Sequence, residues 1–218
     1  AMARGIKVVI IDSGLQSDDY VSFAATDNYV GGKLAAKRLC DVMGNKGKAL
    51  MLRYAEGSAS TMKREQGFLD GMKEYAPGIE LVSTNQYGGV TAESAFQASQ
   101  NLLTKFADVE GVFCPNESST FGMLRALQTA GKAGTIKFVG FDASEPLIAA
   151  LRKKEILGLT VQDPFKMGEI GVRTAVAAIR GEAVEKHIDT GVVMVTPETM
   201  DSAEIKDLLT PDFDKWLD

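Results

Sequence analysis

Six side chains that could recognise a polar ligand follow apolar runs of the sequence or lie just beyond them. They are Asp12, Arg64, Asn116, Glu117, Asp142 and Gln162. Carboxylates, amides and a guanidinium fork suit hydroxyl groups, because each hydroxyl can donate one hydrogen bond and accept another. This set of side chains therefore favours a small ligand that is rich in hydroxyl groups.

The same kinds of residue have a simpler interpretation as helix caps and surface charges. Polar side chains often follow strands because they cap the next helix, and we expect Asp27, Ser118 and Ser144 to do so. Arg64 is flanked by Lys63 and Glu65, as a solvated charge on a helix would be. The pattern alone leaves both interpretations open.

Motifs for catalysis and for cofactor binding are missing from the sequence. No G-x-G-x-x-G or Walker motif follows the first apolar run, and no G-x-S-x-G nucleophile elbow occurs. The single histidine, His187, argues against a histidine-rich metal site and against a Ser-His-Asp triad. Nothing in the sequence marks Asp12 and Asp142 as an acid/base pair. We therefore expect no enzyme, no catalytic residue, no cofactor and no metal.

The composition is that of a packed protein, with 218 residues of which 45% are hydrophobic and 24% charged. The formal net charge of -5, without a basic stripe, argues against nucleic acid and anionic membranes as partners. No apolar run approaches the roughly 20 residues that a membrane-spanning helix needs. Cys40 and Cys114 have no metal-type spacing, and we expect two buried thiols, although a bridge between them stays open.

Apolar runs alternate with amphipathic segments along the whole chain. We expect strands at 5–11, 21–25, 48–52, 79–84, 109–113, 136–141, 157–161 and 188–195. We expect helices after the polar cluster 26–28 and at 61–75, 92–106, 120–130, 146–153, 167–180 and 204–209. The alternation predicts an α/β fold with largely parallel sheets, since parallel strands need a crossover, usually a helix. The polar residues then lie at the carboxyl ends of strands, where open α/β sheets bind ligands.

Several of these segments also resemble one protein family. They include GIKVVIIDSG (5–14), MKREQGF (62–68), NLLTKFADVEGVFCPNE (101–117), FVGFDAS (138–144) and GLTVQDPFKMGEIGV (158–172). In order and spacing they resemble the periplasmic sugar-binding proteins of ABC importers, which have the type I solute-binding fold typified by ribose-binding protein. The resemblance runs nearly end to end. It implies two α/β lobes that close on a small sugar or polyol.

The resemblance gives each polar residue a role by its position. Asp12 is similar to the acidic residue at a strand end of the first lobe. Arg64 is similar to the helix arginine that grips ring or hydroxyl oxygens, and Asn116 to the asparagine of the usual Asn-Asp pair. Asp142 is similar to the aspartate of a Gly-Phe-Asp strand end, and Gln162 to a glutamine at a hinge crossing.

Three further positions depart from the family pattern or match it loosely. Glu117 stands where the family commonly has aspartate, which leaves its role open. Ser13 stands where ribose binders have an arginine, so ribose itself is not implied. Tyr87, in the loop 87–90, lies where the family often has an aromatic platform. We expect all three to contribute to ligand binding.

The first residues of this chain resemble a segment that lies well inside the sequence of the family, not at its beginning. The family has several βα units before the strand 5–11, and these units carry aromatic residues that stack on the sugar. We therefore expect a chain shortened at its amino terminus, starting at Met2 after Ala1, without a signal peptide. A complete carboxy-terminal lobe, flavodoxin- or Rossmann-like with three layers, would span 27–162 with 195–218. A remnant of the amino-terminal lobe would span 1–26 with 163–194.

These expectations lead to one favoured function and one alternative. The favoured function is a periplasmic or otherwise extracytoplasmic solute-binding protein that presents a sugar or polyol to an ABC permease. The shortened chain should bind weakly, and the exposed remnant should favour a homodimer. The alternative is the effector-binding domain of a LacI-type regulator, which shares the fold. No helix-turn-helix is visible in the sequence and the charge is acidic, so we expect the transport protein.

Overall fold

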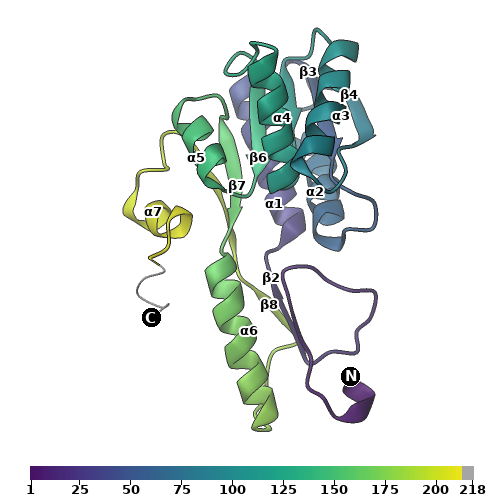
Figure 1. Cartoon of the computed structure of the whole chain (residues 1–218), viewed down its shortest axis with the longest axis vertical. Helices are drawn as coiled ribbons and strands as arrows, with labels where there is room; N and C mark the ends of the chain where they lie inside the picture. The colour runs from purple at the N-terminus through teal and green to yellow at the C-terminus, as the bar shows by residue number, and fades with distance from the viewer. Residues whose placement is uncertain (213–218) are drawn as a thin grey trace.

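The computed structural model describes residues 1–212, which form two lobes joined by three passages of the chain (Figure 1). The larger lobe contains strands β3 Gly47–Arg53, β4 Ile79–Tyr87, β5 Gly111–Phe113, β6 Lys137–Phe141, β7 Gly158–Gln162 and β9 Val192–Val195. Its helices are α1 Asn28–Met43, α2 Ala59–Tyr75, α3 Ala92–Lys105, α4 Glu117–Thr129, α5 Glu145–Arg152 and α7 Ala203–Leu209. The smaller lobe contains the short helix η1 Met2–Arg4, strands β1 Val9–Ile11, β2 Ser22–Ala25 and β8 His187–Asp189, and helix α6 Pro164–Ile179.

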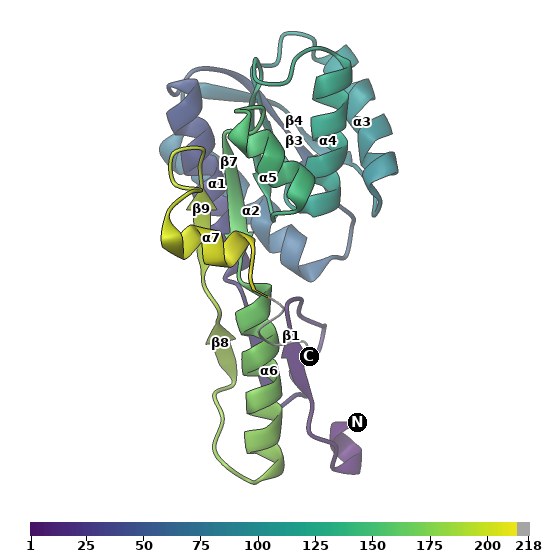
Figure 2. The same cartoon turned by 60° about the vertical axis from the view of Figure 1, so that its left-hand side comes forward.

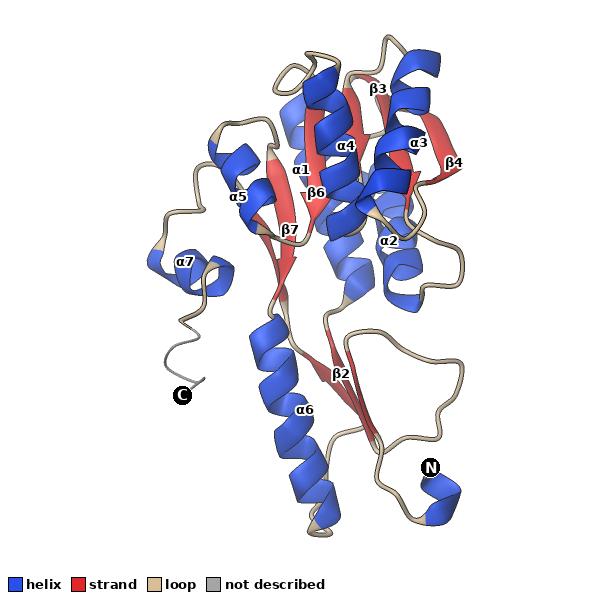
Figure 3. Ribbon diagram, viewed as in Figure 1, coloured by secondary structure: helices blue, strands red, loops and turns tan. Residues whose placement is uncertain are grey.

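The larger lobe is a three-layer α/β unit around a six-stranded sheet in the order β4-β3-β5-β6-β7-β9. Its neighbouring strands are parallel except β9, which runs antiparallel to β7. Helices α1 and α2 pack on one face of the sheet and α3, α4 and α5 on the other (Figure 3). The predicted α/β class with largely parallel strands is therefore confirmed.

The central strand β3 shows why these strands read as continuous apolar runs. Leu50 and Leu52 point into the core under α3, α4 and α5, whereas Ala49 and Met51 point into the core under α1 and α2. All four side chains are buried, because successive residues of a strand face opposite sides of the sheet and both sides are covered.

The smaller lobe has a parallel three-stranded sheet in the order β1-β2-β8. Helix α6 lies along this sheet and packs against β1 and β2 (Figure 2). The packed face of α6 includes Met167, Gly171 and Thr174. Other positions of the same helix are exposed, above all Val172 and Ile179.

The chain passes between the lobes three times. The first crossing, Thr26 and Asp27, joins β2 to α1; the second, Asp163, joins β7 to α6; and the third, Thr190 and Gly191, joins β8 to β9. Side chains tie the first crossing to the third. The Thr26 hydroxyl donates to the Gly191 carbonyl at 3.1 Å.

The expected single strand at 188–195 is wrong. It is two strands, β8 in the smaller sheet and β9 in the larger, separated by the third crossing. Gly191 has φ 88° there, a left-handed conformation that ends a strand and that glycine adopts without strain. The expected strand 5–11 is also too long, since β1 begins at Val9. The described part of the smaller sheet gives β1 one neighbour, β2, and that pairing covers only three residues.

Both cysteines are free thiols, so a bridge between them is excluded. Cys114 is buried, as expected, whereas Cys40 is only partly buried and donates from Sγ to the Tyr75 carbonyl at 2.9 Å. Among the helices of residues 1–212, none is both long and apolar enough to cross a membrane.

Candidate functional site

Arg64 lies at the centre of a polar cluster between the carboxyl ends of the larger sheet and the crossings. It is only 3% exposed, so the alternative interpretation as a solvated helix charge is wrong. Its Nε donates to Asn28 Oδ1 at 2.7 Å, and its Nη1 donates to the Pro115 carbonyl at 3.0 Å and to Asp142 Oδ2 at 3.4 Å. The guanidinium carbon lies 3.9 Å from the centre of the Phe141 ring.

The second terminal nitrogen of Arg64 takes no part in the hydrogen bonds of the cluster. Among the described residues no hydrogen bond uses Nη2, although a guanidinium carries five N–H donors. Burial lowers the pKa of Arg64, and the nearby carboxylates of Asp142 and Asp12 oppose that shift. Arginine stays charged under ordinary conditions, so the site presents a fixed planar donor.

Two closely packed helices bring Arg64 into this position. A Cβ atom at Gly32 of α1 would overlap the backbone carbonyl of Arg64, and a Cβ atom at Gly67 of α2 would overlap the Tyr29 carbonyl. Both glycines therefore serve the tight packing of α1 against α2. The close approach places Asn28, the first residue of α1, within hydrogen-bond distance of Arg64.

Asp142 is the main acceptor of the cluster. It follows β6 in a left-handed conformation, with φ 67°, and its backbone N–H donates to the Thr160 carbonyl at 2.8 Å. Its Oδ1 accepts from Gln162 Nε2 at 2.5 Å, and its Oδ2 accepts from the Glu117 backbone N–H at 3.1 Å as well as from Arg64. The carboxylate is thereby fixed while its side chain remains 23% exposed.

The loop after β5 adds Asn116 and Glu117. Asn116 is the N-cap of α4 and accepts from the Ser119 backbone N–H at 3.4 Å, so the cap expected at Ser118 is wrong. Glu117 is the first residue of α4, and its Oε1 accepts from the Ser144 hydroxyl at 3.0 Å. Ser144 holds the N-cap position of α5, but its side chain makes this contact in place of a capping bond.

Asp12 and Ser13 reach the cluster from the smaller lobe. Asp12 follows β1 with φ 66°, is exposed, and lies near enough to Arg64 to interact with its charge. Ser13 Oγ accepts from the Ser60 backbone N–H at 3.3 Å, which joins the smaller lobe to the start of α2. These two residues therefore lie on the smaller-lobe side of the site.

Tyr87 lies apart from the other sequence-predicted residues. It ends β4, an edge strand of the larger sheet as described, and is 45% exposed. The Arg53 guanidinium lies 5.7 Å from the centre of its ring. Within the described residues no hydrogen bond links Tyr87 to the Arg64 cluster.

Sequence reasoning missed three members of the cluster. Asn28 was read only as part of a capping segment, and Asp27 is indeed the cap, accepting from the Val30 N–H at 3.0 Å. The carbonyl of Pro115 and the ring of Phe141 were also missed. A backbone carbonyl can belong to any residue, so the sequence does not reveal which carbonyl accepts a hydrogen bond. An aromatic residue in an apolar run is interpreted as part of the hydrophobic core.

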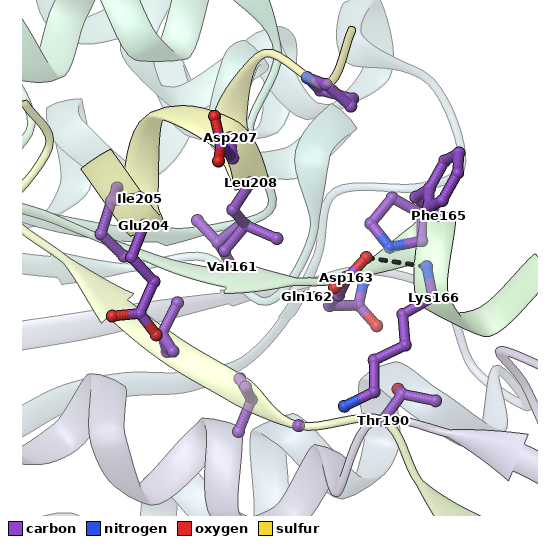
Figure 4. Close-up of a pocket in the computed structure, with 15 residues that line it drawn as sticks. Val161, Gln162, Asp163, Phe165, Lys166, Thr190, Glu204, Ile205, Asp207 and Leu208 are labelled. Carbon is purple, nitrogen blue, oxygen red and sulfur yellow. Dashed lines mark hydrogen bonds between the residues drawn. The ribbon is translucent and has the colours of Figure 1, made fainter. Parts of the chain in front are cut away.

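A cavity of about 410 Å³ lies beside the cluster, between β7, β9, the start of α6 and α7 (Figure 4). Of the sequence-predicted site residues, only Gln162 lines it. Lys166 and Thr190 lie at one end, opposite Ile205 and Leu208 of α7 (Figure 4). No cluster of three or more metal-ligating side chains occurs in the part of the chain that the structure describes.

Comparison with known proteins shows where this chain has relatives. Residues 1–183 match a family model described as a periplasmic binding protein domain. The chain is 27% identical to the ribose import binding protein RbsB of Haemophilus influenzae, over 90% of this chain and 65% of that protein. It is 32% identical to RbsB of Salmonella typhimurium, over 87% of this chain and 63% of that protein. The chain thus spans less than two thirds of the length of these relatives.

Solved structures of similar proteins superpose closely. A carbohydrate transporter solute-binding protein from Agrobacterium radiobacter, in complex with D-arabinose, matches with a TM-score of 0.91 at 32% identity, covering 95% of this chain and 72% of that one. An ABC transporter solute-binding protein from Agrobacterium vitis with bound D-fucose matches with a TM-score of 0.90 at 37% identity, with the same coverage.

Proposed function

Because the chain belongs to the periplasmic binding protein domain family, we propose that it binds a small sugar or polyol for presentation to the membrane permease of an ABC importer. Its relatives are named as ribose import binding proteins, and similar solved structures hold D-arabinose and D-fucose. These names favour a sugar-binding transport role over the effector domain of a LacI-type regulator, and over an enzyme. The extracytoplasmic location is carried over from the same relatives.

One observation carries the proposal: Arg64 is buried yet keeps Nη2 free of hydrogen bonds to the described residues. Nη2 is not among the described side-chain atoms that are buried without a hydrogen-bond partner, so its N–H groups stay accessible to the acceptors of an incoming ligand. Hydroxyl or ring oxygens of a sugar supply such acceptors. The neighbouring Asp142 carboxylate accepts in return, so one ligand satisfies both groups.

The other site residues surround this pair in the proposal. Asn116 and Glu117 supply the loop after β5, and Gln162 closes the side toward the second crossing. Asp12 and Ser13 face the ligand from the smaller lobe. Tyr87 lies further out, and in the proposal its ring offers an apolar platform for the C–H face of a sugar.

The proposed domains are a complete lobe at 27–162 with 195–218 and a remnant of a second lobe at 1–26 with 163–194. Residues 213–218 of the first lie outside the described residues. The smaller lobe contributes only Asp12 and Ser13 to the proposed site. We therefore expect the affinity of this chain alone for the sugar to be about a thousandfold lower than that of a protein with two full lobes. The reason is that contacts worth several kcal/mol of binding free energy are lost.

An exposed apolar stripe on α6 supports a homodimer through the smaller lobe. Val172 is 67% exposed and Ile179 is 73% exposed, and Val176 and Phe165 lie on the same side of the helix by spacing. Ile11 of β1 is exposed as well. Exposed apolar groups gathered on one lobe favour association, and a second copy of this chain carries the same surface.

The proposal is tested by titrating the isotope-labelled chain with five sugars, D-ribose, D-arabinose, D-fucose, D-allose and D-tagatose, and following the backbone amides by NMR. At least one sugar should cause saturable shifts at Glu117 and Asp142, at millimolar concentration given the expected weak binding. Sucrose, a disaccharide too large for a monosaccharide site, is the control. Absence of saturable shifts with every sugar of the panel would contradict the proposal.

A further inference from the structure

Asn28 connects the ligand cluster to the crossings. It is the first residue of α1, directly after the first crossing, and it is almost fully buried. Its Oδ1 accepts from Arg64 Nε at 2.7 Å, and its Nδ2 donates to the Thr26 carbonyl at 3.0 Å. Both ends of this buried amide are therefore hydrogen-bonded, the oxygen to the polar cluster around Arg64 and the nitrogen to the first crossing.

The orientation of this amide follows from its partners. Arginine can only donate and a backbone carbonyl can only accept, so the oxygen of Asn28 must face Arg64 and the nitrogen must face Thr26. A flipped amide would place donor against donor and acceptor against acceptor. Asparagine has its acceptor and its donors on separate atoms, so one end of the side chain can meet Arg64 while the other meets the Thr26 carbonyl.

The connection continues from the first crossing into the third. Thr26 Oγ1 donates to the Gly191 carbonyl, and the Asp27 backbone N–H donates to Asp189 Oδ1 at 3.1 Å. The same Asp189 oxygen accepts from the Gly191 N–H at 2.9 Å, and the Thr190 N–H donates to the Ala25 carbonyl at 3.0 Å. The first and third crossings are thus hydrogen-bonded to each other as a pair.

The second crossing is reached from the other side of the cluster. Gln162, the last residue of β7, donates to Asp142, which in turn pairs with Arg64. The Arg64–Asp142 pair is therefore held at one end by a residue next to the second crossing. At the other end Asn28 holds it to the first and third crossings.

From this arrangement we infer that Asn28 is a positioning residue. Asn28 holds the Arg64 guanidinium in place and couples the position of that guanidinium to the first and third crossings. The inference rests on the proposed function in one respect, namely that the ligand that moves Arg64 is a sugar. A ligand that draws Arg64 toward itself changes the hydrogen bond to Asn28 and, through Thr26, the pairing of the two crossings. The coupling between Asn28 and the crossings exists without ligand and can be measured without it.

The sharpest variant is Asn28→Asp. An ionised carboxylate still accepts from Arg64 Nε but cannot donate to the Thr26 carbonyl, so the link to the crossings is replaced by two acceptors that face each other. A carboxylate in the first turn of a helix favours the helix macrodipole, so α1 itself is not weakened. Asn28→Leu removes both links and is the second variant. Ser99→Ala is the matched control, since it deletes a buried side-chain bond to the Ala95 carbonyl in α3.

The readout is NMR-detected amide exchange in the full chain at Thr190 and Gly191, which share no hydrogen bond with Asn28 among the described residues. We expect Asn28→Asp and Asn28→Leu to speed exchange at both amides about tenfold, while the Val112 amide in β5 and the Ser99→Ala variant stay unchanged. Faster exchange confined to residues 28–31 would show a local structural role and overturn the inference. So would unchanged exchange at Thr190 and Gly191 in folded Asn28→Asp.

A ligand arm separates this inference from the proposed function. With D-arabinose as the probe, the wild-type chain should show slower exchange at Thr190 and Gly191. Asn28→Asp should show the same sugar shifts at Glu117 and Asp142 without that slowing. Equal slowing in both proteins would overturn the coupling. If no sugar of the panel shifts any resonance, the proposed function fails, and the ligand-free comparison still decides the role of Asn28.

Discussion

Asp12 and Asp142 occupy equivalent places in the two sheets. Each follows a strand, β1 or β6, in a left-handed conformation with φ of 66° and 67°. Each donates its backbone N–H to a carbonyl of the next strand, Ala24 or Thr160, at 3.1 and 2.8 Å. Aspartate is among the few residues that adopt this conformation readily, so the same strand end is built twice, once in each lobe.

This equivalence allows a matched comparison of two substitutions. Asn tolerates the same backbone conformation as Asp, so Asp142→Asn changes only the side-chain chemistry. A single amide oxygen cannot accept from Gln162, Glu117 and Arg64 together, and the buried guanidinium loses its ion pair. We expect Asp142→Asn to lower the free energy of unfolding by about 2 kcal/mol, less than for a fully buried pair because Asp142 is partly exposed.

Asp12→Asn is the control for that change. Its carboxylate is exposed, and no hydrogen bond among the described residues uses it. We expect a change within about 0.5 kcal/mol, measured for both variants by urea unfolding. Equal losses in the two variants would contradict the central role given to Asp142.

The burial of Glu65, which pairs with Arg53, gives stability a dependence on pH. Glu65 accepts from Arg53 Nη1 and from the Tyr54 backbone N–H, both at 3.1 Å, and is buried. Burial raises the pKa of Glu65 above its ordinary value of 4.5, although Tyr54 and Arg53 oppose the shift. The folded state therefore holds this proton to higher pH than the unfolded state does. The contribution is fully present below the unfolded pKa and is lost as pH rises through the folded pKa.

Glu65→Gln isolates this contribution from the other carboxylates. Gln keeps an acceptor for Arg53 or Tyr54 but does not titrate. The difference in free energy of unfolding, wild type minus Glu65→Gln, should fall as pH rises above about 4.5 and then level off. The measurement is urea unfolding of both proteins at closely spaced pH values between about 4 and 8. A difference that stays constant or grows with pH would refute the assignment.

The exposed stripe on α6 predicts the association state. Val172→Glu places a charge in the middle of the proposed dimer surface, where burial of an unpaired carboxylate is costly. We expect the wild-type chain to dimerise at concentrations well above micromolar, and the Val172→Glu chain to stay monomeric in sedimentation velocity. Val30→Glu makes the same change at an exposed valine of α1 and should leave the dimer intact. A monomeric wild type, or a loss of dimer with both variants, would count against the surface.

The sequence was sufficient for most of the larger sheet, and the reason lies in its burial. Residues 49–52 and 111–113 contain no polar or charged side chain because both faces of the sheet are covered there, and such runs are recognised without knowing their partners. The prediction of a single strand at 188–195 is wrong because the partners of its two halves cannot be recognised from the sequence. Its two halves pair with different sheets, β8 with β2 and β9 with β7, and tertiary pairing decides where one strand ends.

The candidate site divides in the same way. Arg64, Asp142 and Gln162 were predicted to lie together because the ends of parallel strands share one edge of a sheet, and the structure joins them by hydrogen bonds. That they bind a sugar remains a prediction. Asn28 could not be predicted, because its contact with Arg64 exists only where α1 and α2 approach at Gly32. The cap of α4 was misplaced by two residues, since Asn116 and Ser118 are both good caps and local geometry chooses between them.

The most direct measurement is the sugar affinity of Arg64→Lys. Lysine keeps the charge but loses the fork, and with it the free Nη2 donors that the account assigns to the ligand. Arg125→Lys makes the same exchange at a partly exposed arginine of α4, paired with Glu93, and is the control. With the sugar of the panel that binds the wild type, NMR titration should show at least tenfold weaker binding for Arg64→Lys and no change for Arg125→Lys. Unchanged affinity in folded Arg64→Lys would contradict the account.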